Sequence, residues 1–461
     1  MKLTVIGGGG VRTPLFVASA LRRAAQSGLE ELCLMDIDAG RLDTIGHLCQ
    51  SVAQYFASPV KITTTLEPQE AVEGADYVVT TIRVGNEAGR VLDERIALRQ
   101  GVLGQETTGP GGFAMAMRSI PALLHYAELI QKVSPGAWLL NFTNPAGLVT
   151  QALRSSGFER TVGICDGANL AQRDVAQWLK VDPKLLRAEV FGLNHLSWTR
   201  RVWMEDQEVL QGLLRNPDFC ANSSLRIFDQ SLIQLFRLHL NEYLYYYYDA
   251  EKALRQIGQD EQTRGEEVLR LNQKLFQTLR EPRYLENPQE AIQVYLGYEK
   301  RRGATYMHYA QPDGPSMEEA DRFDYSALQF SPEEGEGYAG VALDIVNAMQ
   351  RGEMLFTALN VPNQGAIHGF QDDDVVEVSC RVAGGEIRPE PIGEIPAVPL
   401  HLAQQVKHYE RLAVEAILKR SRGLAILALM EHPLVLSYTR AETLVDAYLT
   451  AHAPFIGEWS A

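Results

Sequence analysis

Residues 5–13 read Val-Ile-Gly-Gly-Gly-Gly-Val-Arg-Thr, and the run 2–6 that leads into the glycines predicts a buried strand. The pattern at 12–27 predicts a helix, so the glycines form the turn between the two elements. In such a unit the backbone can approach a pyrophosphate, and the amino end of the helix carries partial positive charge. The stretch therefore predicts a dinucleotide site. The residues expected to contact the cofactor are Gly7, Gly8, Gly10, Val11 and Arg12.

An acidic residue follows the next predicted strand. The apolar run 31–35 ends at Met35 and is followed by Asp36. A carboxylate at this position accepts hydrogen bonds from the adenosine ribose and repels a 2′-phosphate. Asp36 therefore favours NAD over NADP. A plain tight turn after a strand is the alternative interpretation of the glycines alone.

Strand and helix patterns alternate through the first part of the chain. Alternation of buried strands with helices is typical of a doubly wound, Rossmann-type parallel sheet in an α/β fold, similar to lactate and malate dehydrogenases. We expect residues 1–168 to form this NAD-binding domain. Residues 169–461 are expected to form an α+β substrate and catalytic domain that completes the site. The predicted strands are 2–6, 31–35, 59–64, 76–82, 137–142 and 161–164, with a further helix at 114–133.

The second part of the chain has a mixed pattern. A strand-rich stretch is predicted at 375–395, and 310–335 is predicted to be mobile, because it combines Pro, Gly and acidic residues with little apolar periodicity. The long helical stretches are expected at 224–256, 260–281, 334–352 and 400–432.

Composition limits the class of protein. The chain has 461 residues, a net charge of −15 and no Lys/Arg-rich run, which argues against nucleic-acid or membrane partners. The run of 18 apolar residues that a membrane span needs is absent from the sequence. The cysteines number five and form no CxxC pair, so a reducing compartment, the cytoplasm, is expected.

Polar loops follow several of the predicted strands. Ligands collect at the carboxyl ends of strands in a doubly wound sheet. Arg83 can clamp a phosphate or carboxylate, and Asn144 can hydrogen-bond sugar hydroxyls or the nicotinamide. Arg83 and Asn141 are also expected to contact the cofactor. A surface arginine and a helix-capping asparagine are the structural alternatives.

Cys165 ends the strand at 161–164, and His195 lies in Gly-Leu-Asn-His-Leu at 192–196. A thiolate and an imidazole can bind a transition metal and leave positions open for substrate oxygens. Because the two residues are 30 apart, the spacing alone leaves ordinary packing open as the alternative.

Together these motifs resemble the family 4 glycoside hydrolases. The strings that carry the resemblance run in order from GGGGVRTP through IRVG, GQETTGPGG, NFTNPAG, GLNHLSW and EYLYYYY to NQGAI at 363–367. The resemblance implies NAD, Mn²⁺ or another divalent cation, and a homodimer or homotetramer. It also implies hydrolysis by oxidation of the sugar at C3, loss of the C2 proton, elimination, addition of water at C1 and re-reduction.

The resemblance also assigns roles to residues. Tyr243 matches the base, Asp166 is a candidate general acid, and Cys165 and His195 match the metal ligands. Arg83, Asn144 and Arg264 match substrate contacts. The implied substrate is a small phosphorylated glycoside, a 6-phospho-β-glucoside.

The string Cys165-Asp166-Gly167-Ala168 departs from the family pattern, in which a proline is usual at the fourth place. A 6-phospho-α-glucosidase or a glycosidase for unphosphorylated sugars therefore stays open. From other classes, an NAD-dependent 2-hydroxy-acid dehydrogenase and a catalytically silent NAD sensor stay open as well.

Overall fold

The computed structural model describes residues 1–259, 261–311, 330 and 337–460. Its main sheet has nine strands in the order β13-β12-β11-β6-β5-β4-β1-β2-β3. The strands are β1 (Lys2–Ile6), β2 (Glu31–Met35), β3 (Lys61–Thr65), β4 (Tyr77–Thr80), β5 (Trp138–Asn141), β6 (Thr161–Gly163), β11 (Leu355–Pro362), β12 (Val375–Ala383) and β13 (Glu386–Pro389).

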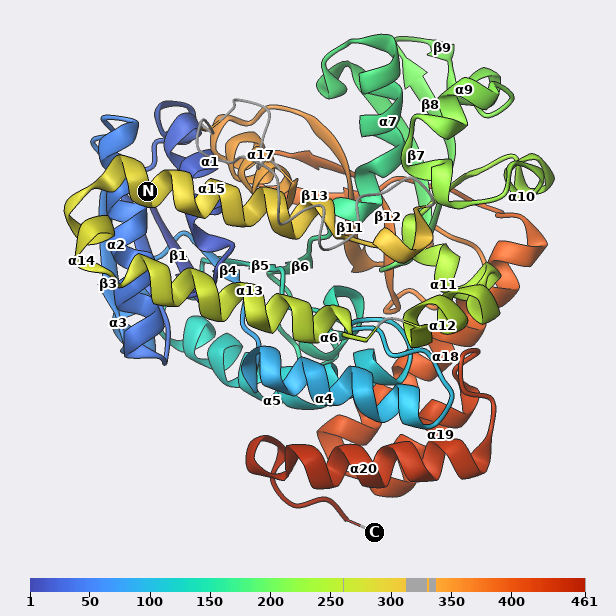
Figure 1. The fold of residues 1–461 in the computed structure, drawn as a ribbon. Coiled ribbons are helices and arrows are strands. Elements are labelled where there is room, and N and C mark those ends of the chain that lie inside the picture. The colour runs from blue at the N-terminus through green and yellow to red at the C-terminus, as the bar shows by residue number, and fades with distance from the viewer. Residues whose placement is uncertain (260, 312–329, 331–336, 461) are drawn as a thin grey trace.

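The strands from β3 to β6 are all parallel, which confirms the predicted Rossmann-type sheet. The central strands β1, β2 and β4 are buried along almost their whole length, because helices cover both faces of the sheet. The helices of this part are α1 (Thr13–Ser27), α2 (Ala39–Tyr55), α3 (Pro68–Val72), α4 (Asn86–Arg99), α5 (Pro110–Val133), α6 (Ala146–Ser155) and α7 (Leu170–Leu179). In Figure 1, α1 lies above the sheet, and α5 and α6 lie below it.

The strand order reverses between β1 and β4, because the chain runs outward from β1 to β3 and then returns to the other side of β1. The loops after β1 and β4 diverge at this point and leave a crevice at the carboxyl ends of the strands, where doubly wound folds bind their ligands.

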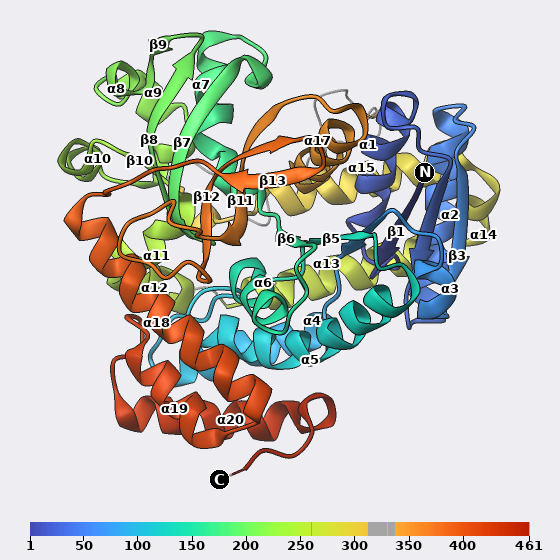
Figure 2. The same cartoon turned by 180° about the vertical axis from the view of Figure 1, so that it is seen from behind.

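The sheet does not end with the first part of the chain. Strand β11 pairs antiparallel with β6, and β12 and β13 continue the sheet antiparallel. Figure 2 shows these orange strands extending the sheet toward the green β7–β8 hairpin. The strand-rich stretch at 375–395 is confirmed as β12 and β13, but its union with the first sheet was not predicted. The domain boundary at residue 168 stays a prediction.

A second sheet carries the β-hairpin β7 (Leu186–Leu193) and β8 (Leu196–Met204), with β9 (Gln207–Glu208) and β10 (His239–Leu240) beside β8. The Ser379 side chain of β12 accepts a hydrogen bond from the Val190 backbone at 2.8 Å and ties the hairpin to the main sheet. The two residues between β7 and β8 are Asn194 and His195. Asn194 Nδ2 donates to Glu377 Oε1 of β12 at 3.2 Å, which fixes the hairpin turn beside β12.

Two of the predicted helices are wrong as single elements. The stretch 224–256 is interrupted, since Arg237 adopts a left-handed conformation and β10 follows it. The stretch 400–432 is divided where Arg420 is left-handed and Ser421 caps the next helix. The helices of this half are α8 (Leu210–Leu213), α9 (Pro217–Ala221), α10 (Gln230–Phe236), α11 (Tyr245–Tyr248), α12 (Ala250–Gln259), α13 (Arg264–Leu279), α14 (Pro282–Glu286), α15 (Pro288–Ala304), α17 (Gly337–Arg351), α18 (Ala397–Lys419), α19 (Arg422–Glu431) and α20 (Tyr438–Ile456), with short 3₁₀ turns η1 (Asp166–Asn169), η2 (Pro183–Leu185), η3 (Ser224–Ile227), η4 (Glu242–Leu244) and η5 (His308–Ala310).

The predicted helices at 260–281 and 334–352 are found as α13 and α17. Most of the stretch 310–335, predicted to be mobile, lies outside the described residues. Among the helices in the described part of the chain, none combines the length and apolar character that a membrane crossing requires.

Candidate active site

A cavity of about 1250 Å³ opens at the carboxyl ends of β1, β2, β4 and β6. Its wall combines the glycine loop, the loops after the other strands, the β7–β8 turn and the amino end of α13. Segments that are far apart in the sequence therefore meet in one cavity. The predicted site residues that line it are Gly7, Gly10, Val11, Arg12, Asp36, Arg83, Asn144, Cys165, Asp166, His195, Tyr243 and Arg264.

The glycine loop lies close to two neighbouring strands. Gly7 has φ +95°, and a Cβ added to it would lie 2.6 Å from the Thr81 carbonyl oxygen, so only glycine fits there. The Gly9 amide donates to Asp36 Oδ2 at 2.9 Å. Helix α1 starts after this loop without a side-chain cap, which leaves its amino end available to an anion.

Two residues predicted to contact the cofactor do not line the cavity. A Cβ on Gly8 would lie 2.8 Å from the Leu34 Cβ, so Gly8 allows the loop to pack on β2. Asn141 is completely buried; it accepts from Thr80 Oγ1 at 3.0 Å and donates to the Thr143 carbonyl oxygen at 3.2 Å. Its amide group is used to join the ends of β4 and β5.

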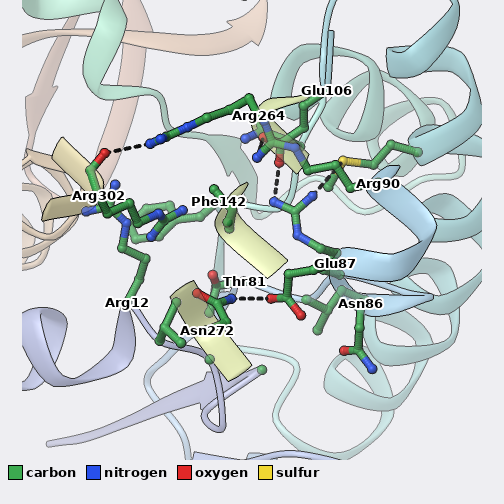
Figure 3. A pocket seen from close by; sticks show the side chains of 18 of the residues that line it. Arg12, Thr81, Asn86, Glu87, Arg90, Glu106, Phe142, Arg264, Asn272 and Arg302 are labelled. Carbon is green, nitrogen blue, oxygen red and sulfur yellow. Dashed lines mark hydrogen bonds and ion pairs between the residues drawn. The ribbon is translucent and has the colours of Figure 1, made fainter. Parts of the chain in front are cut away.

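Arginine side chains gather around one acidic residue in the cavity. Glu106 pairs with Arg83 and lies 2.6 Å from Arg90 Nη1. Burial alone would raise the pKa of Glu106, but the two guanidinium groups hold this pKa well below its ordinary value. Figure 3 shows Glu106 and Arg90 on the same side of the pocket. The ion pair with Glu106 holds Arg83 in the cavity wall beside the glycine loop.

Arg264 lies at the first turn of α13, which begins with a capping box formed by Thr263 and Glu266. Its guanidinium donates to Glu267, to Thr305 Oγ1 and to the Arg302 carbonyl oxygen. Burial lowers the pKa of Arg264, and the positive charge of Arg302 acts in the same direction. Arg12, Arg264 and Arg302 lie around the same pocket in Figure 3 and make this part of the wall suitable for an anion.

The structure brings Cys165 and His195 together. Cys165 Sγ lies 3.3 Å from His195 Nε2, and both side chains are buried. Cys165 lies two residues after the end of β6, whereas His195 occupies the β7–β8 turn with φ +61°. Left-handed backbone of this kind is uncommon outside glycine and is held in place by the surrounding structure.

A short chain of hydrogen bonds orients the His195 ring. Thr107 Oγ1 lies 3.2 Å from Gln105 Oε1, to which its hydroxyl donates, and 2.9 Å from His195 Nδ1. The hydroxyl oxygen therefore accepts from Nδ1–H, which leaves the lone pair of Nε2 directed toward Cys165 Sγ. A metal-binding histidine is oriented in the same way by the partner of its other ring nitrogen.

The chemistry of this pair fits a divalent transition metal. Burial lowers the pKa of His195 to about 4, so the imidazole is neutral and can act as a ligand. Burial raises the pKa of the Cys165 thiol, which a bound cation would reverse. Within the described residues there is no group of three or more His, Cys, Asp or Glu side chains that could hold a metal. Two protein ligands leave the remaining positions to substrate or water oxygens.

Tyr243 lies against the same histidine. Its ring stacks on His195 with centroids 3.8 Å apart and an interplanar angle of 4°. The Asn241 side chain accepts from the Tyr243 amide at 3.0 Å and fixes the turn η4. Burial, together with the neighbouring Glu242 carboxylate, raises the pKa of Tyr243 well above its usual value, so a nearby positive charge is needed for this phenol to lose its proton.

Other members of the tyrosine run have structural contacts. Tyr246 also lines the cavity, whereas Tyr245 is fully buried and hydrogen-bonds Gln256. Tyr247 packs near His432. The tyrosines of 243–248 therefore divide between the cavity wall and the buried core.

Several cavity residues were not predicted as site residues. They are Arg90, Glu106, Glu242, Arg302 and Tyr306. Tyr306 donates to Glu242 Oε1 at 2.7 Å, and burial raises the pKa of Glu242 to about 7. Glu106 stands in the quoted polar loop at 104–112 and was detectable there. Glu242 is the first residue of the quoted string EYLYYYY and was detectable in the same way. Arg90, Arg302 and Tyr306 carry no local signal, since they are charged or aromatic residues of ordinary helices and turns.

Comparisons with known proteins agree with this geometry. The model of the family 4 glycosyl hydrolases matches residues 2–181, and that of the family's C-terminal domain matches residues 190–435. The chain is 30% identical over 471 residues to a probable 6-phospho-beta-glucosidase of Bacillus subtilis, covering 100% of this chain and 98% of that protein.

Solved structures of two phospho-glucosidases are similar to this chain over nearly its whole length. The 6-phospho-beta-glucosidase of Thermotoga maritima, solved with manganese, NAD+ and glucose-6-phosphate, superposes with a TM-score of 0.81 at 28% identity, covering 99% of each chain. A 6-phospho-alpha-glucosidase from gut microorganisms, solved with NAD and Mn2+, has a TM-score of 0.80 at 25% identity, covering 100% of this chain and 99% of that one.

Proposed function

The chain belongs to family 4 of the glycosyl hydrolases, and we propose that it hydrolyses 6-phospho-β-glucosides with NAD+ and a divalent cation such as Mn²⁺. The observation that carries the proposal is the approach of Cys165 to His195, at 3.3 Å, in the cavity that also contains the glycine loop and Tyr243. A dinucleotide, a cation and a sugar can meet only where these elements share one space.

When bound, NAD+ supplies a hydride acceptor for C3 of the sugar, and the cation supplies a Lewis acid for the sugar oxygens. Cys165 and His195 would hold the cation, while Asp36, Arg12 and the glycine loop would hold the dinucleotide. These side chains and the glycine loop line the one cavity at the carboxyl ends of the strands.

Two side chains of the protein move protons. Tyr243, held against the His195 ring, takes the proton from C2, which a ketone at C3 makes acidic. Asp166 follows Cys165 and lines the cavity, so it is placed to protonate the oxygen of the leaving group. Elimination followed by addition of water at C1 would then give net hydrolysis, with no net oxidation of the sugar.

The positive wall supports a phosphorylated substrate. Arg264, Arg302 and Arg83 line the cavity, where guanidinium groups outnumber carboxylates around one anion site. A bound phosphate would share Arg264 with Glu267 and Arg83 with Glu106. Asn144 lines the same cavity and can bind sugar hydroxyls. Similarity to 6-phospho-beta-glucosidases supports the β anomer.

The α anomer is the second candidate. Asp166 lies in the cavity beside Cys165, and an acid in this place suits an axial leaving group. The chain is also similar to 6-phospho-alpha-glucosidases, which supports this candidate.

We also propose that the protein acts in the cytoplasm as a homodimer or homotetramer. The five cysteines are all free and buried, which supports a reducing compartment. The resemblance to the family supports the homodimer or homotetramer, which light scattering can measure.

A panel of nitrophenyl glycosides tests the proposal. Both anomers, with and without 6-phosphate, are supplied with NAD+, Mn²⁺ and a thiol reductant, and the release of nitrophenol and the formation of NADH are recorded. We expect release from the 6-phospho-β-glucoside without accumulation of NADH. Release only from the α anomer would select the second candidate, and NADH formed in proportion to product would instead indicate a dehydrogenase.

A further inference from the structure

Arg41 lies next to Asp36 at the dinucleotide end of the cavity. Both residues line the cavity, and they meet across the glycine loop. A Cβ built on Gly9 would lie 2.9 Å from Asp36 Oδ2 and 3.1 Å from the Arg41 Cβ. In related folds, an arginine close to this position accommodates the 2′-phosphate of NADP. Arg41 therefore lies where a guanidinium could pair with the 2′-phosphate of NADP+.

The Arg41 guanidinium is bound to another group. Arg41 Nη1 and Nη2 lie 3.1 Å and 3.3 Å from the two carboxylate oxygens of Glu87, and Nη1 lies 3.2 Å from Asn86 Oδ1. The same guanidinium lies over the Phe276 ring, 4.9 Å from its centroid. Bidentate pairing and aromatic stacking together fix the planar guanidinium in one orientation.

Glu87 is itself held in place. Its Oε1 accepts from Asn272 Nδ2 at 2.7 Å, and Asn272 Oδ1 accepts from the Tyr298 hydroxyl. Figure 3 shows Glu87 joined to Asn272 in the lower part of the pocket. The acid belongs to α4 and Asn272 belongs to α13, so the packing of two helices determines where Arg41 points.

The local balance of charge is unfavourable to a second phosphate. The carboxylates of Asp36, Asp38 and Glu87 line this end of the cavity, and both Asp36 and Asp38 act on Arg41. The nearby guanidinium of Arg280 is not part of the lining and donates to Thr44 Oγ1 and to the Gly40 carbonyl oxygen. A 2′-phosphate would meet three carboxylates and an arginine that already has a partner.

We propose that Glu87 is a specificity-determining residue, because it binds the Arg41 guanidinium and so prevents it from pairing with a 2′-phosphate. The inference rests on the proposed function, which places a dinucleotide at the glycine loop. NADP+ is then excluded in two separate ways, by repulsion from Asp36 and by the pairing of Glu87 with Arg41. NAD+ lacks the 2′-phosphate and needs no contact with Arg41.

Binding of NAD+ and NADP+ to the full-length protein, followed by calorimetry without sugar or metal, tests the proposal. We expect Glu87→Gln to tighten NADP+ binding by about tenfold or more, the equivalent of one guanidinium–phosphate contact, with little change for NAD+. The gain should disappear in Arg41→Leu/Glu87→Gln. No gain, or a gain that persists in the double variant, would overturn the proposal.

Glu242→Gln is the matched control, since it removes a carboxylate from another part of the same cavity. An equal gain there would show that net charge alone is responsible and would also overturn the proposal. Failure of the unchanged protein to bind NAD+ would count against the proposed function, whereas NAD+ binding with no gain in Glu87→Gln counts only against this inference.

A second arm keeps Glu87 intact. In an Asp36→Ser background, the additional change Arg41→Leu should leave NADP+ binding unchanged within about twofold, because Glu87 still holds the arginine. A loss of about tenfold would mean that Arg41 reaches the 2′-phosphate despite Glu87, and the proposal would be wrong.

Discussion

Replacement of Thr107 by valine should weaken the metal site without touching a ligand. The change keeps the shape of the side chain and removes the hydroxyl that lies 2.9 Å from His195 Nδ1. A buried N–H left without an acceptor costs about 1–3 kcal/mol. Loss of such a partner of a metal-binding histidine typically weakens metal affinity by about 10–100-fold, which is about 1.4–2.8 kcal/mol. The two figures agree, so we expect an effect in this range.

The measurement is the dissociation constant of Mn²⁺, obtained by calorimetry and from the Mn²⁺ dependence of turnover. Thr108→Val is the matched control. Thr108 is the next residue in the same loop, and its amide shares the acceptor Gln105 Oε1 with that of Thr107. Its own hydroxyl is buried and has no hydrogen-bond partner among the described residues, so removing it should change Mn²⁺ affinity little.

The reasoning would be refuted by equal Mn²⁺ affinities for the unchanged protein and Thr107→Val. It would also be refuted by equal losses in Thr107→Val and Thr108→Val, because a general disturbance of the loop would then explain both. Far-ultraviolet circular dichroism of each variant establishes that the fold is retained.

Four further predictions concern catalysis, binding and stability. Tyr243→Phe should lower kcat for an unactivated glycoside by about 10²–10⁴-fold and leave NAD+ binding unchanged, and near-normal turnover would remove its role as the base. A substrate deuterated at C2 should show a primary isotope effect or lose its label to solvent, whereas full retention of deuterium in the product would reject elimination. Arg264→Ala should weaken binding of a phosphorylated glycoside by at least about tenfold more than that of its unphosphorylated analogue, and equal losses would argue against a phosphate contact. His432 accepts a hydrogen bond from the Leu434 amide, and burial lowers its pKa to about 3. Because the unfolded state then binds more protons below the ordinary pKa of about 6.5, the free energy of unfolding should fall by up to about 1.4 kcal/mol per pH unit as pH drops from 6.5 toward 3. Urea titrations at pH 7 and 5 measure this loss, and the same pH slope in His432→Gln would contradict the assignment.

The sequence by itself determined the parallel sheet and the glycine loop. Strands such as β1 and β2 are buried almost along their whole length, so each is a mostly apolar run that is visible without knowledge of its neighbours. The loop at Gly7 also has a local cause, because its positive φ and the approach of the Thr81 carbonyl require glycine. Properties that arise within one element can be predicted from that element.

Only the tertiary structure decided which distant residues meet. Cys165 and His195 converge because the β7–β8 turn is fixed beside β6, and the addition of β11–β13 to the sheet places that turn. The pairing of Arg41 with Glu87 likewise depends on helix α13, which packs against both α4 and α2. Contacts of this kind are chosen by the packing of separate elements and by the burial of charge, and neither leaves a periodic trace in the sequence. Side chains that share a cavity, such as Glu106 with Arg83 and Arg90, therefore become apparent only in the folded chain.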